Sequence, residues 1–350
     1  MPRRAAALIA LSLSGCGTLS TSELPPAAEP RDSPPLLTRP AGRVVRVGPP
    51  IGQLAADRTV SPGGAPEGLA FDPRSGVLAV GLRRPAELAL LDGDSGRVLR
   101  RVGLPAGPRH LAVADGVFRV PAEMAERVLA VRARDGRVLS DVATGPQPHA
   151  VAVTGDGTVA VGNEGEASVG LFRGGSRPQT VPAALQPGGV IALDDGRYAV
   201  ISVRERVVEV FEADGRRIAR EPAGVGPTHG VYRNGVLWVT DTQGDALLVF
   251  QLEPELALDR RLRLRTGPYG IALDPVAERL WVTLTGSNRL VELPAHGRPH
   301  VLASYPTVRQ PNDVAVDSRT GRVFVGGRAD GVVQLLDPVR AQHAQPVGSG

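Results

Sequence analysis

Short apolar runs alternate with turn residues along most of the chain. Between Pro268 and Tyr305 the runs are "GIALD", "RLWVTL", "RLVEL" and "PHVLASY", and Gly, Pro, Asn or Asp separates them. Runs of this length that are bounded by turn residues indicate β-strands, and they lack the 3.6-residue period of an amphipathic helix. We therefore predict an all-β protein in which each unit of this kind contributes four strands.

The same unit recurs seven times. Each copy opens with Pro, followed by one to three small or polar residues and a short apolar strand. The opening prolines lie 39 to 43 residues apart, at Pro66, Pro108, Pro148, Pro187, Pro227, Pro268 and Pro311. This period is typical of the four-stranded blades of a β-propeller and falls outside the ranges of leucine-rich and ankyrin repeats. We predict a seven-bladed propeller over residues 42–337, followed by a C-terminal tail at residues 338–350.

The closure of the ring can also be predicted. The seventh unit contains only three clear strands, "DVAV", "RVFVGG" and "VVQLL". The segment "GRVVRVG" (Gly42 to Gly48) closely matches "GRVLRRVG" (Gly96 to Gly103), the fourth strand of the first unit. We predict that this N-terminal strand completes the seventh blade; the alternative is that Pro338 to Val347 supplies the missing strand.

The N-terminus has the layout of a secretory signal. Arg3 and Arg4 precede an apolar run from Ala5 to Leu13, which is too short to span a bilayer as a helix. The sequence Leu13-Ser14-Gly15-Cys16 resembles the lipobox of bacterial lipoproteins. The resemblance implies that residues 1–15 are a signal peptide and that Cys16 carries a lipid; the alternative is an ordinary signal peptide with an incidental Cys.

Residues 16–41 are rich in Ser, Thr, Pro and Ala and show no apolar periodicity. Such composition predicts a flexible tether. Together with the lipid, it would anchor a soluble domain to a membrane. We expect an extracytoplasmic, lipid-anchored protein of the bacterial cell envelope.

Composition excludes several kinds of chemistry. All 40 basic residues are Arg, so the chain has no P-loop Lys, Schiff-base Lys or Ser-Lys pair. Its formal charge of +4 gives no argument for a nucleic-acid partner, and we expect none. A single Cys rules out a disulfide framework and a thiolate zinc site. We expect a monomer.

Candidate binding residues lie where each unit enters its innermost strand. In propellers these entry turns, and the loops between the second and third strands, surround one mouth of the central channel. The entry positions are occupied by Glu67, Arg109, His149, Gly189, His229, Tyr269 and Asn312, and the next position adds His110 and Asp313. His149 and His229 can ligate a divalent metal together with Glu67 or Asp313, or act as acid and base near neutral pH. The alternative is that these side chains hydrogen-bond loop backbone and channel water.

The loops between the second and third strands carry charges of both signs. Such a face suits a protein or peptide partner, and the alternative is a solvated rim. The loop positions are Arg83, Arg84, Glu123, Glu126, Asn163, Glu164, Arg204, Glu205, Asp241, Gln243, Asn288, Arg289, Arg328 and Asp330. The long loop Pro49 to Ala65 precedes the first innermost strand, so we expect it to be a lid or a binding loop.

The units resemble known propeller families. Second strands such as "LWVTD" (Leu237 to Asp241) and "LWVTL" (Leu280 to Leu284) are similar to the YVTN and NHL-like repeats, which implies the fold but no single activity. "PHAV" (Pro148 to Val151) and "THGV" (Thr228 to Val231) resemble the histidine-bearing turns of streptogramin lyases, which are seven-bladed and magnesium-dependent.

The resemblance to the lyases implies that His149 and His229 are candidate catalytic residues. In that family, however, the catalytic histidines come from neighbouring blades, and a Glu lies two residues before one of them. Here the histidines are 80 residues apart, and Gln147 and Pro227 occupy the matching positions. We therefore expect a ligand- or protein-binding scaffold rather than an enzyme. The alternative is a metal-dependent lyase or lactonase with its site at the channel mouth.

Overall fold

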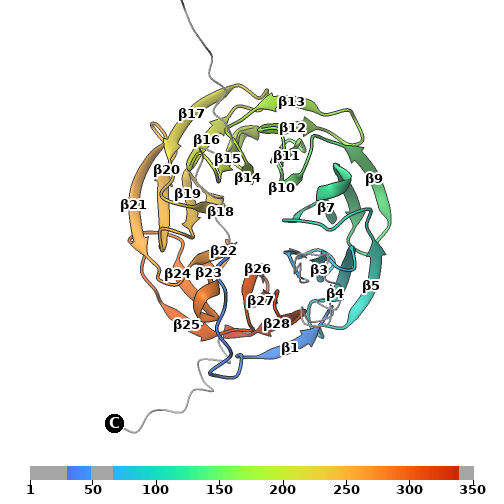
Figure 1. Cartoon of the computed structure of the whole chain (residues 1–350), viewed down its shortest axis with the longest axis vertical. Coiled ribbons are helices and arrows are strands. Elements are labelled where there is room, and N and C mark those ends of the chain that lie inside the picture. The colour runs from blue at the N-terminus through green and yellow to red at the C-terminus, as the bar shows by residue number, and fades with distance from the viewer. Residues whose placement is uncertain (1–29, 49–65, 339–350) are drawn as a thin grey trace, which may run out of the picture.

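The computed structural model is a ring of seven four-stranded blades around a central channel (Figure 1). It describes residues 30–48 and 66–338. The all-β, seven-bladed prediction is confirmed. The predicted signal peptide, Cys16 and the loop from Pro49 to Ala65 lie outside the described residues.

The blades are numbered one to seven in chain order, beginning with β2. The innermost strands are β2 (Gly68–Asp72), β6 (Ala112–Ala114), β10 (Pro148–Val153), β14 (Pro187–Ala192), β18 (Pro227–Arg233), β22 (Pro268–Asp274) and β26 (Pro311–Asp317). The second strands are β3 (Val77–Leu82), β7 (Val117–Ala122), β11 (Val159–Asn163), β15 (Tyr198–Ser202), β19 (Val236–Asp241), β23 (Arg279–Leu284) and β27 (Arg322–Gly327).

The outer half of each blade is built in the same way. The third strands are β4 (Glu87–Asp92), β8 (Arg127–Arg132), β12 (Ser168–Phe172), β16 (Val207–Phe211), β20 (Ala246–Gln251), β24 (Arg289–Pro294) and β28 (Val332–Leu336). The outermost strands are β1 (Arg43–Arg46), β5 (Val98–Gly103), β9 (Val138–Ala143), β13 (Gln179–Pro182), β17 (Arg217–Pro222), β21 (Ala257–Arg263) and β25 (Ala303–Pro306). Three short 3-10 turns are η1 (Glu123–Ala125), η2 (Asp194–Gly196) and η3 (Thr285–Ser287).

The N-terminal strand closes the ring. β1 pairs antiparallel with β28, from Arg43 opposite Leu335 to Arg46 opposite Val332, so blade seven has the order β1-β28-β27-β26. Just beyond the strand, Val47 is only 1% exposed and joins the core between blades seven and one. The pairing satisfies the hydrogen-bonding edge of β28, which would otherwise be open. The prediction that Gly42 to Gly48 closes the ring is confirmed.

The core lies between neighbouring blades. Its clusters combine side chains from two adjacent sheets, as where Phe71 of blade one stacks on Phe324 of blade seven with ring centroids 5.2 Å apart. The innermost strands approach one another closely, since a Cβ on Gly68 would lie 2.4 Å from the carbonyl oxygen of Arg109 in the next blade. Packing from both sides therefore fixes the direction in which each innermost strand points. Within the described residues, no helix is both long enough and apolar enough to cross a membrane.

Candidate functional site at the channel mouth

A repeated backbone irregularity directs side chains into the channel mouth. In five innermost strands the pairing with the second strand slips by one residue directly after the opening proline, for example between Pro148 and Val151. Proline has no N–H to donate and is tolerated at the first position of a strand. The extra residue forms a bulge, which re-aims the side chain that follows. His149, His229 and Tyr269 all lie in these bulges.

Three histidines from blades two, three and five contact one another. The Nε2 atoms of His110 and His229 are 2.9 Å apart, and the two rings meet edge to face. The ring of His149 lies 5.0 Å from that of His110, and the ring of Tyr269 lies 4.6 Å from that of His229. The structure therefore brings together four of the side chains that the sequence placed around the mouth.

Burial keeps the central histidine pair neutral. It lowers the pKa of His110 well below its usual range, and repulsion from His229, His149 and Arg109 adds to this effect. Burial and the charge of His149 lower the pKa of His229 to about 3. At neutral pH one imidazole of the pair donates the shared hydrogen bond and the other accepts it. The pair is thus poised for hydrogen bonding rather than for carrying charge.

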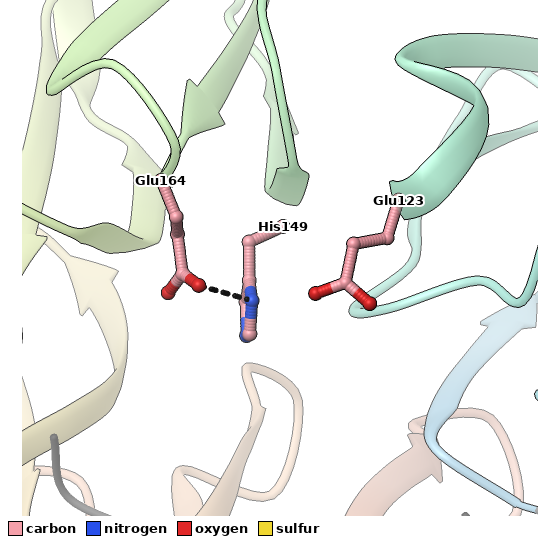
Figure 2. A group of neighbouring side chains, drawn as sticks. All are labelled: Glu123, His149 and Glu164. Atoms are coloured by element: carbon pink, nitrogen blue, oxygen red, sulfur yellow. Dashed lines mark ion pairs between the residues drawn. The ribbon is translucent and has the colours of Figure 1, made fainter. Parts of the chain in front are cut away.

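His149 lies between two carboxylates (Figure 2). Its Nδ1 is 3.2 Å from Oε2 of Glu164, and Glu123 approaches from the opposite side. One ligand atom from each of these residues lies within 4.8 Å of the others. Imidazole nitrogen with carboxylate oxygen is a donor set that divalent metals accept. Among the described residues, this is the only group of three or more His, Cys, Asp or Glu side chains spaced to hold a metal ion.

Arginines compete for one of these carboxylates. Arg109 donates from Nε to Oε1 of Glu123 at 2.8 Å, and Arg83 donates to Oε2 at 2.6 Å. Burial raises the pKa of Glu123, but the charge of Arg109, its hydrogen bond and Arg83 together hold that pKa below its usual range. The pKa of Glu164 is likewise lowered, because the ion pair with His149 outweighs burial. A metal would have to displace a guanidinium from Glu123.

Glu67 belongs to a different set of contacts from the histidines. Its Oε1 accepts a hydrogen bond from Nη1 of Arg109 at 3.0 Å, and its Oε2 lies 3.4 Å from Nε of Arg328. Arg109 therefore bridges the buried carboxylates of blades one and two. Burial lowers the pKa of Arg109, but the charges of the two carboxylates raise it by a larger amount. The pKa therefore lies above its usual range, and Arg109 stays charged. The structure does not join Glu67 to His149 and His229 as the predicted metal ligands require.

Asn312 and Asp313 hold blade seven against blade one. Asp313 accepts hydrogen bonds from the backbone N–H groups of Leu69 and Val314, each at 2.8 Å. Burial raises its pKa to about 7, opposed by these hydrogen bonds and reinforced by the charge of Glu67. Asn312 is fully buried, and its amide lies 3.4 Å from the backbone carbonyl of Glu67. These two predicted site residues thus act on the backbone rather than on the histidine group.

A small pocket opens beside the histidines. Its volume is about 80 Å³. It is lined by Arg109, His149, Glu164, Gln186, Gly188, Val203, Thr228, His229 and Tyr269. Gln186, Thr228 and Val203 were not singled out from the sequence. A signal for Gln186 exists, because Gln precedes the opening proline in three units, at Gln147, Gln186 and Gln310, each with a positive φ angle.

Comparison with family models and with curated proteins found no match. Solved structures share the fold. The chain is similar to "Kuenenia stuttgartiensis Hydrazine Synthase", with a TM-score of 0.72, 15% identity and coverage of 81% of this chain and 98% of that chain. It is also similar to a streptogramin B lyase, with a TM-score of 0.67, 14% identity and coverage of 79% and 94%. For the virginiamycin B lyase from Staphylococcus aureus the values are 0.68, 13%, 84% and 98%. At these identities the comparisons show a shared seven-bladed fold, which by itself fixes no activity.

Proposed function

We propose that this protein is a lipid-anchored, extracytoplasmic scaffold of the bacterial cell envelope whose channel mouth binds a small polar ligand or a polar group of a protein. The observation that carries the binding role is the pocket of about 80 Å³, whose wall combines guanidinium, imidazole, carboxylate, amide and hydroxyl groups. Such convergent donors and acceptors fix the orientation of a polar group. Since one molecule of liquid water takes about 30 Å³, the pocket suits a group the size of an amide or a carboxyl.

The resting contacts of the mouth favour binding over chemistry. Glu123 is held by two arginines, and His110 and His229 are bonded to each other. Against the effect of burial, the two arginines also lower the pKa of Glu123, which makes it a weak general base near neutral pH. The pocket, in contrast, is open beside them without rearrangement.

A thermal-shift series with small carboxylates, amides and ammonium compounds tests the binding role. A ligand that binds only the folded state raises the melting temperature, by an amount that grows with the ratio of its concentration to its Kd. We expect one of these classes to do so for the wild type and to lose the effect in Gln186→Gly, which removes a pocket side chain at a position whose positive φ suits Gly. Gln147→Gly is the matched control, because Gln147 has the same backbone conformation but is exposed. A shift that is equal in both variants would place binding elsewhere, and no shift with any class would contradict the proposal.

The lipid anchor has its own test. Metabolic labelling with a radioactive fatty acid, followed by membrane fractionation, compares the wild type with Cys16→Ser. We expect label and membrane association for the wild type and neither for the variant. Unlabelled wild-type protein would remove the anchor from the proposal but leave the pocket untouched.

A metal-dependent lyase or lactonase is the second candidate. The observation in its favour is the Glu123, His149 and Glu164 group. Metal content measured by mass spectrometry on chelator-free protein without a His-tag decides between the two. Stoichiometric divalent metal that is lost in both His149→Ala and Glu164→Gln would favour the enzyme, whereas metal-free wild type that still binds its ligand supports the scaffold.

A further inference from the structure

The last part of the predicted tether is docked on the propeller. Residues 30–41, which we call the strap, run from beside β22 near the centre of the ring out to β1 at the rim (Figure 1). Their inner end is bonded to blade six: the backbone N–H of Arg31 donates to Oγ1 of Thr285 at 3.1 Å, and the hydroxyl of Ser33 donates to the Thr285 carbonyl at 2.7 Å. Asn288 donates to the carbonyl of Pro34 at 2.9 Å. These partners lie in the loop between the second and third strands, on the mouth face.

The side chain of Arg31 is seated in a shaped site. Its guanidinium pairs with Asp245 of blade five at 2.8 Å. Its aliphatic stem crosses Gly267 and Gly286, where a Cβ would come within 2.9 Å and 3.4 Å of it. Because side chains at these two positions would crowd the Arg31 stem, the two glycines form a cradle. The strap is therefore held by charge, hydrogen bonds and close packing together.

The outer end of the strap is fixed as well. The backbone N–H of Ala41 donates to the carbonyl of Pro306 at 3.0 Å, and the Gln334 amide donates to the Ala41 carbonyl at 2.7 Å. With both ends held, the strap begins at Pro30 near the start of β22 (Figure 1), and Tyr269, the second residue of that strand, lines the pocket. The N-terminal end of the strap therefore lies near the channel mouth and not at the rim, where β1 begins (Figure 1).

We infer that the strap turns the channel mouth toward the membrane, so that the ligand of the pocket is a polar group presented at the lipid surface. The inference rests on the proposed lipidation of Cys16, which precedes Pro30 by fourteen residues. A chain of that length spans at most about 50 Å when fully extended and on the order of 20 Å as a random coil. Were the strap free, nearly twice as many residues would separate the anchor from β1, and any face of the ring could meet the membrane.

Exposed apolar side chains offer positions at which this orientation can be tested. Leu37 of the strap is 94% exposed, and Met124 of η1 is 72% exposed. When apolar side chains with this degree of exposure enter the interface of a bilayer, the free energy of the system falls. Val276, in the turn between β22 and β23 on the opposite face, is 75% exposed and offers a position of matched exposure.

Lipid photocrosslinking tests the orientation. The full chain is bound to vesicles of phosphatidylethanolamine and phosphatidylglycerol with benzoylphenylalanine in place of Met124 or of Val276, and lipid adducts are measured by mass spectrometry. We expect severalfold more adduct at position 124 than at position 276. The double variant Arg31→Ala plus Ser33→Ala should remove most of this difference while the melting temperature of the propeller stays close to that of the wild type. Equal adducts in the wild type, or a difference that survives strap disruption, would overturn the inference.

Failure of the anchor and failure of the orientation are distinguishable. If metabolic labelling shows that Cys16 is not lipidated in the cell, a maleimide lipid attached to the Cys16 thiol of the full chain supplies the anchor in the same crosslinking experiment. A preference for position 124 would then support the strap as an orienting device although the proposed cellular anchor had failed. If the preference for position 124 were lost with the chemical lipid in place, the orienting role of the strap would be rejected.

Discussion

The two sides of the channel mouth use the same strand position for different purposes. On one side, the histidine arc of His110, His149, His229 and Tyr269 joins its members by ring contacts and borders the pocket. On the other side lies the carboxylate arc, which consists of Glu67, Asn312, Asp313 and Arg328. Its polar atoms form ion pairs and backbone hydrogen bonds between blades seven and one. The repeated units therefore share the direction in which this side chain points, but they do not share its chemical type.

The two arcs also differ in how they respond to protons. Burial favours the neutral forms of His110 and His229 in the histidine arc by lowering their pKa values. In the carboxylate arc, burial raises the pKa of Asp313 to about 7, so this carboxyl ionises near neutral pH. Protonation of the histidines in acid therefore destabilises the first arc, and ionisation of Asp313 at higher pH destabilises the second. The folded mouth is most stable between these two pH limits. Arg109 links the arcs, because it pairs with Glu67 of the carboxylate arc and with Glu123, which lies beside His149 of the histidine arc (Figure 2).

Removing that link should have the largest effect. Arg109→Ala leaves Glu67, 1% exposed, and Glu123, 6% exposed, without their shared cation. Breaking a buried ion pair from one side costs about 3–5 kcal/mol, and the loss here should lie at the lower end of that range because Arg83 stays paired with Glu123 and Arg328 stays near Glu67. We expect a loss of this size in the free energy of unfolding, measured by urea denaturation at pH 7.

The control for Arg109 is an arginine in an exposed ion pair. Arg127 binds Asp141, and both side chains are more than a third exposed. Exposed pairs contribute about 0–1 kcal/mol, so Arg127→Ala should cost little. Similar losses in the two variants would show that the network around Arg109 is solvated and does not join the arcs.

The sequence predicts the positions in the mouth but not their partners. Blade number, strand count and closure follow from local period and turn residues, and each repeat places its entry residue at the same point. The hydrogen bond between His110 and His229 joins residues 119 positions apart, and it depends on how the bulge in β18 directs His229 and how the turn before β6 directs His110. The pairing of Arg109 with Glu123 depends in the same way on a loop conformation, that of η1. The docking of the strap depends on contacts with Thr285 and Asp245. No sequence pattern in residues 30–41 predicts these contacts.

The histidine arc should make the protein sensitive to acid. The folded-state pKa values of His110 and His229 lie below the ordinary value of 6.5, so the unfolded chain binds more protons as the pH falls below 6.5. We expect the wild type to lose stability between pH 7 and pH 4, and His110→Gln to reduce that loss. Urea denaturation at several pH values measures it, with the exposed His300→Gln as control. Parallel pH profiles for all three proteins would mean that the central histidines titrate normally.

The carboxylate arc should give the opposite and smaller trend. Asp313 has a folded-state pKa of about 7 against an ordinary value of 3.8, so its contribution is present at low pH and is lost as the pH rises through 7. Asp313→Asn should therefore gain about 1 kcal/mol relative to the wild type between pH 6 and pH 8. The control lies at the other end of β26, where burial raises the pKa of Asp317 but hydrogen bonds from Arg319 and Thr320 outweigh it and lower the pKa. Asp317→Asn should cost stability at neutral pH, and this cost should shrink in acid. If the two variants changed with pH in the same direction, the difference between the arcs would not be one of proton binding.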